Sequence, residues 1–202
     1  MKFQLLTAAF AATAAAVPAL RTRQSNGTTI GDNEPFGLIA LRSGSAIHFS
    51  SFSAAQNGIQ IGLDSQDASC DSTGSAPNDA TFYLSNGALY LLTPSNITQE
   101  LYTDRSGMGQ GVLQYSTTPG GYQAGRNSET TGWTIDAAGD LTFDGADFIA
   151  CPDSIDGAWS AWISAGVTQP GGSTGCVSVV ARAIKAVQTP AVCTYSYTPV
   201  SA

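Results

Sequence analysis

The sequence predicts an all-β domain, an antiparallel sandwich or barrel of many short strands that is cross-linked by disulfides. Runs of apolar or alternating residues recur about every ten residues and are separated by turn-forming Gly, Asn, Asp and Pro. Asn86-Gly87 lies between two such runs and is typical of a type I′ hairpin turn, because both residues readily take positive φ values. No segment shows a sustained helical period. Strands are therefore favoured over helices throughout.

The expected strands follow one another along the chain. In the first half they are residues 36–41, 46–49, 59–63, 81–84 and 89–92. In the second half they are residues 133–136, 141–143, 148–151, 158–163, 176–181 and 193–197, of which the last is expected to close the sheet. Residues 181–187 are expected to bend into a helical turn, and the polar residues 64–79 to form a long loop around Cys70.

The chain divides into three parts. Residues 1–19 combine a single cationic residue, Lys2, with an Ala-rich apolar stretch and a small-residue end, which is the pattern of a secretory signal peptide and is too short to span a membrane. Residues 20–34 are polar and lack periodicity, so we expect a flexible N-terminal arm. Residues 35–202 are expected to form a single β domain.

Charge and composition restrict the possible partners. The formal net charge is −7, and only 11% of residues are charged, so solubility depends mainly on hydroxyl, amide and acidic side chains. Such a chain does not bind nucleic acid or an anionic membrane through a basic surface. Together with the signal peptide, this composition predicts a soluble, exported protein.

The four cysteines are Cys70, Cys151, Cys176 and Cys193, an even number that favours two disulfides in an exported chain. There is no CxxC motif and His48 is the single histidine, so zinc has no evident ligand set. Three pairings are possible. We expect Cys70–Cys151 and Cys176–Cys193, because the second pair would close a short C-terminal excursion and the first would join the two halves of the domain.

Two kinds of surface site are suggested. Sequons at Asn26 and Asn96 lie in terminal or turn-like sequence and predict N-glycosylation. Trp159 and Trp162 lie within 147–166, which is best interpreted as a core segment. Their spacing of three residues places them on opposite faces of a strand, so an outward-facing tryptophan is a candidate carbohydrate contact that would stack on a sugar ring.

Motifs associated with catalysis lack their usual context. Gly171–Gly175 matches G-x-S-x-G, but Pro170 precedes it and no histidine follows. Gly107–Gly111 lacks the GK[ST] ending of a phosphate loop, and His48 is expected to be an exposed or hydrogen-bonded strand residue. Six acids follow turns rather than an EF-hand pattern: Asp136, Asp140, Asp144, Asp147, Asp153 and Asp156. We therefore expect no catalytic residue, no cofactor and no metal, and a hydrolase is the less favoured alternative.

Five sequence segments are unusual enough to be compared with known families. They are FGLIALRSGSAIHF at 36–49, GLDSQDASCD at 62–71, DRSGMGQG at 104–111, GWTID at 132–136 and DFIACPDSIDGAWSAWISAG at 147–166. Through these strings, residues 35–195 resemble the fungal cell wall protein phiA family. The resemblance implies a secreted protein associated with the cell wall and with phialide and conidium development, and it assigns no active-site residue.

These observations lead to a functional expectation. The protein is expected to be extracellular, associated with the cell wall and non-enzymatic, with a wall polysaccharide or a wall protein as its partner. The final residues, PAVCTYSYTPVSA, lack the hydrophobic tail of a GPI signal, so retention is expected through non-covalent contact or cross-linking. The alternatives are an apoplastic elicitor or effector recognised by a plant host, and a carbohydrate-binding module.

Overall fold

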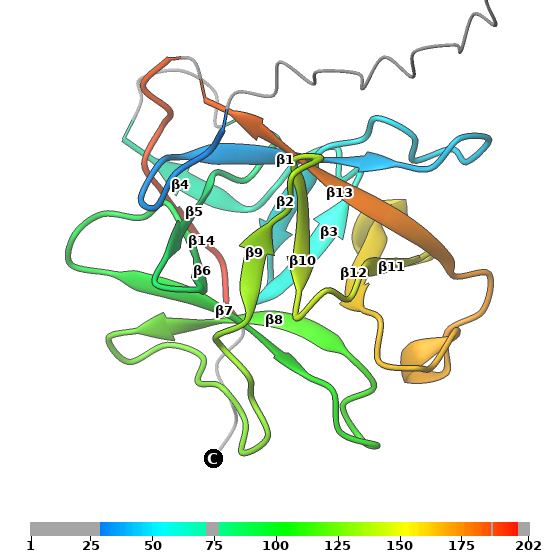
Figure 1. The fold of residues 1–202 in the computed structure, drawn as a ribbon. Coiled ribbons are helices and arrows are strands. Elements are labelled where there is room, and N and C mark those ends of the chain that lie inside the picture. Colours follow the sequence, from blue (N-terminus) through cyan, green and yellow to red (C-terminus); the bar gives the residue numbers. More distant parts are fainter. Residues whose placement is uncertain (1–28, 72–76, 187, 198–202) are drawn as a thin grey trace, which may run out of the picture.

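The structure, a computed structural model, describes residues 29–71, 77–186 and 188–197, and this part of the chain consists mainly of antiparallel strands (Figure 1). The strands are β1 (Phe36–Leu41), β2 (Phe52–Ala55), β3 (Gly58–Ile61), β4 (Ala68–Cys70), β5 (Phe82–Ser85), β6 (Ala88–Leu91), β7 (Thr98–Asp104), β8 (Val112–Thr118), β9 (Trp133–Ile135), β10 (Asp140–Phe143), β11 (Phe148–Cys151), β12 (Trp159–Ile163), β13 (Val177–Lys185) and β14 (Cys193–Tyr195). Short 3₁₀ turns occur at η1 (Ile155–Gly157) and η2 (Pro170–Gly172). The predicted all-β fold class is confirmed.

The main sheet closes on itself. From β1 the paired order is β5, β6, β7, β8, β12, β11 and β13, and β13 pairs back with β1. The two strands of this last pair run side by side across the upper part of Figure 1, from Phe36 opposite Lys185 to Leu41 opposite Val180. β3 pairs with both β8 and β12 and carries β2, whereas β10 pairs with β13 and carries β9. Of the two predicted architectures, this closed antiparallel circuit is that of a barrel.

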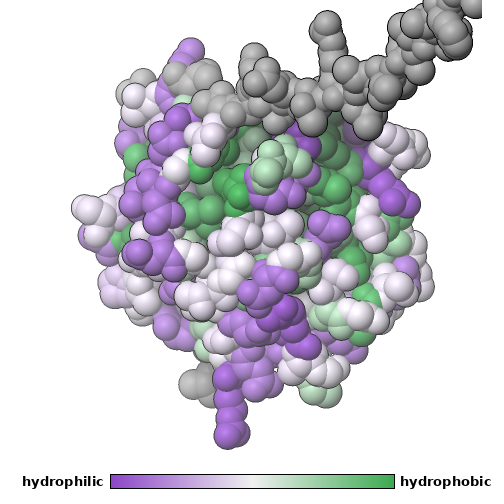
Figure 2. Space-filling model, in the orientation of Figure 1, coloured by the Kyte–Doolittle hydropathy of each residue, from purple (hydrophilic) through white to green (hydrophobic). Residues whose placement is uncertain are grey.

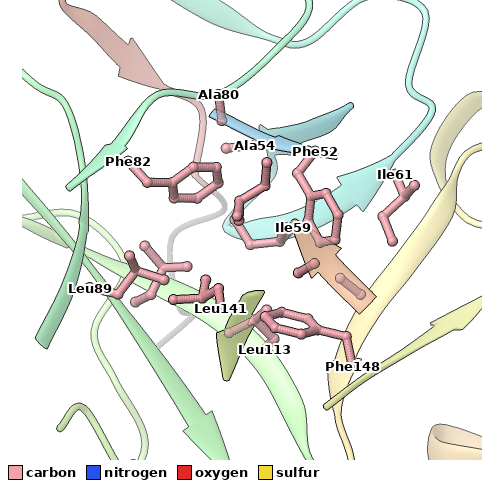
Figure 3. Close-up of a cluster of buried hydrophobic side chains, with 14 of the residues drawn as sticks. Phe52, Ala54, Ile59, Ile61, Ala80, Phe82, Leu89, Leu113, Leu141 and Phe148 are labelled. Atoms are coloured by element: carbon pink, nitrogen blue, oxygen red, sulfur yellow. The ribbon is translucent and has the colours of Figure 1, made fainter. Parts of the chain in front are cut away.

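Side chains from all sides of the barrel fill its interior. In Figure 3, Phe82 and Leu89 approach from one side while Phe52, Ile59 and Phe148 approach from the other. The rings of Phe52 and Phe148 meet edge to face with 5.7 Å between centroids. All five of these side chains are at most 2% exposed. Their burial follows from the alternation of the strands, which places every second residue inside.

The hairpin at residues 82–91 forms as predicted. Asn86 and Gly87 have φ values of 52° and 77°, as a type I′ turn requires. A second tight hairpin joins β2 to β3 through Gln56 and Asn57, whose φ values are 50° and 55°. Gln-Asn is a less characteristic turn pair than Asn-Gly, so this hairpin was not predicted.

Two predicted elements are wrong, and the loop predicted at 64–79 contains the short strand β4. The alternating residues 46–49 form a turn, in which the amide of His48 donates to the carbonyl of Ser45 and Phe49 has a φ of 68°. The helical turn expected at 181–187 is absent from its described residues, because β13 continues to Lys185. Its inward alternation extends through Ala183, and the ladder with β1 provides partners for its backbone.

The predicted disulfide pairing is also wrong. The structure contains Cys70–Cys193 and Cys151–Cys176. β4 and β14 pair with Cys70 directly opposite Cys193, in a separate two-stranded sheet, so the last strand does not close the main sheet as expected. Cys151 ends β11, and Cys176 directly precedes the neighbouring strand β13. Proximity across paired strands, rather than proximity in sequence, decides which cysteines meet.

The described end of the expected N-terminal arm contacts the barrel. Ile30 packs against the core, and Glu34 forms an ion pair of 2.7 Å with Lys185. The predicted signal peptide and the sequon at Asn26 lie outside the described residues. In the ranges that the structure describes, no helix has the length and apolar character needed to cross a membrane.

Candidate functional site

The two tryptophans proposed as carbohydrate contacts lie on β12 and are both half-buried. Trp159 packs against the hydrophobic core. Trp162 faces the other way, and its Nε1–H donates to Ser160 Oγ at 2.9 Å. A Cβ atom added to Gly171 would lie only 2.7 Å from the Trp162 ring, so the turn at η2 is packed directly on the ring. Core packing of Trp159 and the η2 turn against Trp162 each cover part of a ring, and carbohydrate contact by either tryptophan stays a prediction.

The residues of the hydrolase-like motif hold a turn together. Gly171 donates its amide to Gln110 Oε1, and Ser173 donates its amide to the carbonyl of Pro170. His48 Nδ1 accepts the amide of Arg42 at 3.0 Å within its own turn. These hydrogen bonds hold the two turns in place and link the η2 turn to Gln110 of the DRSGMGQG loop.

Five of the six acids between 136 and 156 belong to turns or ion pairs. Asp136 Oδ1 accepts the amides of Ala138 and Asp140, which closes the turn between β9 and β10. Others have positive φ values or basic partners: Asp140, Asp144, Asp153 and Asp156. Across the described ranges, no three His, Cys, Asp or Glu side chains gather as metal ligands would.

The loop after β7, which carries the string DRSGMGQG, is highly organised. Asp104 Oδ1 accepts the amide of Ser106, and the carbonyl of Asp104 accepts the amide of Gly111. Ser106 in turn accepts the amides of Gly109, through its side chain, and of Gln110, through its carbonyl. These bonds fix the loop while leaving its tip residue Met108 in solvent.

Arg105 anchors this loop to the neighbouring segments. Its guanidinium group contacts Glu129 at 2.5 Å and Asp144 at 2.8 Å, and it lies 4.7 Å from the centre of the Phe143 ring. The hydrogen bond from Arg105 lowers the pKa of Glu129 and outweighs the opposing effects of burial and of Asp104. The cluster joins the DRSGMGQG loop to the segment before β9 and to the end of β10.

Acid is expected to weaken this cluster. Because the folded pKa of Glu129 lies below its unfolded value of about 4.3, the contribution of Glu129 is present above that pH and is lost as the pH falls through the lowered pKa. Urea unfolding at neutral and acidic pH should therefore show a smaller acid-induced loss of stability for Glu129→Gln than for the wild type. Equal losses would contradict this assignment.

Four side chains form a row across the outer face of β5 to β8, which we call the tyrosine strip: Tyr83, Tyr90, Glu100 and Ser116. Each is directly opposite the next in the strand register. The rings of Tyr83 and Tyr90 stack with 5.1 Å between centroids and 17° between planes. Tyr90 OH donates to Glu100 Oε1 at 3.4 Å. All four residues are half-buried, so the strip is fixed by its neighbours yet reachable from solvent.

A second group of polar and aromatic side chains lies beside the strip. Tyr102 and Tyr122 both donate to Gln114 Oε1, at 2.8 and 2.9 Å, and their rings are stacked. Tyr102 is only 2% exposed, because Tyr122 covers it. Figure 2 shows that hydrophilic side chains dominate the lower half of the face, over β7, β8 and the loop that follows β8, whereas apolar side chains gather above, near β13.

A groove of about 620 Å³ lies on another part of the surface, between the β9–β10 turn and the end of β13. Its walls are largely apolar and include Ile30, Ile135 and Ile184. Both basic residues on its rim are already paired, Arg182 with Asp140 and Lys185 with Glu34. The groove is thus formed mainly by apolar side chains and by basic groups that already have acidic partners.

The sequon at Asn96 occupies an exposed turn between β6 and β7, closed by the amide of Ile97 donating to the carbonyl of Pro94. A glycan at this position would project into solvent. Occupancy of the sequon stays a prediction.

The closed barrel, its two disulfides and its polar outer face define an extracellular all-β protein. A family model described as PhiA-like secreted protein matches residues 36–196. The chain belongs to this family. Its relatives place it outside the cell and in the cell wall, as the sequence predicts.

Several curated relatives are similar over most of their length. "Cell wall protein phiA" of Aspergillus niger is 49% identical over 188 residues, which is 92% of this chain and 94% of the relative. The protein of the same name from Emericella nidulans is 52% identical over 163 residues, 81% of this chain and 87% of the relative. That of Aspergillus fumigatus is 50% identical over 164 residues, 81% of this chain and 86% of the relative. No solved structure matches the chain.

Proposed function

We propose that this protein is a non-enzymatic component of the fungal cell wall, held there by contact with a wall polysaccharide, and that it contributes to conidium and phialide development. The observation that carries the proposal is sequence identity to proteins named for the cell wall. About half of the aligned residues are identical in these proteins, and the alignments cover 81–92% of the chain. The half-buried aromatic and carboxylate side chains on the outer face of the barrel support a binding role.

The described fold supports a role as a durable binding module. Two disulfides and a closed strand circuit restrict unfolding outside the cell, where no reducing system repairs the chain. The motifs that resembled catalytic sites serve as turns, and the surface is acidic and hydroxyl-rich. A carbohydrate-binding module, one of the alternatives from sequence, is thus compatible with wall association, and polysaccharide binding is the means of retention that we propose.

Sequential extraction of isolated walls tests the proposal. Non-covalent retention predicts that hot detergent releases the protein and that later glucanase digestion releases little more. Release by glucanase alone would show covalent attachment, and recovery of all the protein from the medium would contradict wall retention. Deletion of the coding sequence should reduce the number of normal phialides and conidia, and unchanged conidiation would contradict the developmental role.

A further inference from the structure

The tyrosine strip has the features of a preorganised binding site. Strand pairing fixes the order of its side chains, and the stacking of Tyr83 on Tyr90 holds both rings in place. The strip crosses three inter-strand spacings, or about 14 Å, which is enough for a short run of sugar rings. Binding to rings that are already ordered loses little side-chain entropy.

The polar groups of the strip suit hydroxyl-bearing ligands. Glu100 Oε1 accepts from Tyr90, but within the described part of the chain Oε2 of Glu100 accepts no hydrogen bond, and Glu100 takes part in no ion pair. This carboxylate can accept hydrogen bonds from ligand hydroxyls. Burial and the charge of Glu100 raise the pKa of Tyr83 and of Tyr90, so both phenols are protonated near neutral pH. Tyr90 already donates to Glu100, which leaves the Tyr83 hydroxyl to donate to a ligand.

Charge restricts the ligand further. The whole chain has a net charge of −7, and a carboxylate lies within the strip itself. An anionic polymer would meet repulsion from both. A neutral pyranose polymer has apolar C–H faces that can stack on the two tyrosine rings. Its hydroxyl groups can donate to the carboxylate of Glu100, so it complements both the aromatic and the polar residues of the strip.

We propose that the tyrosine strip of Tyr83, Tyr90, Glu100 and Ser116 is the site at which this protein binds a neutral wall polysaccharide. The assignment rests on the proposed function and adds the residues and ligand class through which retention occurs. β-Glucan and chitin share the required chemistry, since both present neutral pyranose rings with free hydroxyls.

Co-sedimentation of the secreted mature protein with insoluble β-glucan and with chitin tests the assignment. The wild type should bind at least one of them, and Tyr83→Ala/Tyr90→Ala should weaken that binding about tenfold. Tyr83→Phe/Tyr90→Phe, which keeps the rings, should retain most of it, and Glu100→Gln should weaken it several-fold. The matched control is Phe49→Ala, which removes a 65% exposed ring from the turn that follows β1; it should bind like the wild type.

The outcomes separate the two proposals. If the wild type binds neither polysaccharide, polysaccharide retention itself is wrong. If it binds but the alanine variant binds equally well, retention stands and the tyrosine strip is not the site. Preferential binding to polygalacturonate would overturn the neutral-ligand assignment.

A second measurement tests the site on the wild type alone, so it does not depend on the folding of the alanine variant. Titration of the wild type with a soluble oligosaccharide from the polysaccharide that binds, followed by NMR, should shift amide signals at residues 82–91 and around Glu100. Shifts confined to other surfaces would overturn the assignment even if no variant folds.

Discussion

Gly111→Ala is expected to lower the free energy of unfolding by about 4 kcal/mol, the combined cost of backbone strain and overpacking. Gly111 has a φ of 91°, a region that side-chain-bearing residues rarely adopt. A Cβ atom at this position would lie 1.9 Å from the carbonyl oxygen of Ile163. That carbonyl belongs to β12, whose amide at Ile163 also donates to the carbonyl of Gly111, so the two segments cannot separate without losing this bond.

Gly107→Ala provides the matched control in the same loop. No atom lies within 4 Å of a Cβ at Gly107, and its φ is not in the left-handed region. Its free energy of unfolding should stay within about 0.5 kcal/mol of the wild type. Urea unfolding of both variants measures the contrast, and similar stability of Gly111→Ala and Gly107→Ala would contradict the close packing of this loop on β12.

Loss of the Cys70–Cys193 disulfide should have the second large effect. Replacing both cysteines with serine frees a loop with a sequence separation of 123 residues, and the chain-entropy estimate for such a loop is about 4–5 kcal/mol of unfolding free energy. This disulfide also fixes β14 against β4 in a sheet of only two strands. Without it, the end of the chain is held by the burial of Tyr195 and by the two hydrogen bonds between Gln99 and the backbone of Tyr195.

The second disulfide is the natural comparison. Cys151–Cys176 has a sequence separation of 25, so its removal should cost about 3.5 kcal/mol, less than removal of the first. Thermal and urea unfolding of the two double-serine proteins would show which disulfide contributes more to the free energy of unfolding. Mass spectrometry of unreduced peptides should recover both pairs, and a Cys70–Cys151 peptide would contradict the structure.

Local signals in the sequence were sufficient for some of the fold. Asn86-Gly87 predicts its hairpin because the turn chemistry lies within two adjacent residues. At residues 46–49, alternation alone suggested a strand, but the residues form a compact turn that reaches β1 only at its end, where the amide of Phe49 donates to the carbonyl of Ala40. The disulfide pairing was not predictable because it depends on which distant strands pair.

In the candidate site, too, one part follows from local sequence and another depends on the pairing of strands that are distant in the sequence. A two-residue turn at Asn86-Gly87 places Tyr83 opposite Tyr90, so this half of the tyrosine strip follows from the hairpin register. Glu100 and Ser116 join them only through the pairing of β6 with β7 and of β7 with β8. Sequence reasoning chose tryptophans for their stacking capacity, and the packing of the η2 turn on Trp162 could not be known from spacing.

The distribution of the protein between wall and medium in living cultures tests the central claim most directly. Strains that secrete the wild type, Tyr83→Ala/Tyr90→Ala or Phe49→Ala at equal levels can be compared by quantifying each protein in detergent extracts of washed walls and in the culture fluid. The account predicts that the wild type and Phe49→Ala stay mainly in the wall, whereas the folded tyrosine variant moves mainly to the medium. Equal wall retention of all three proteins would contradict it.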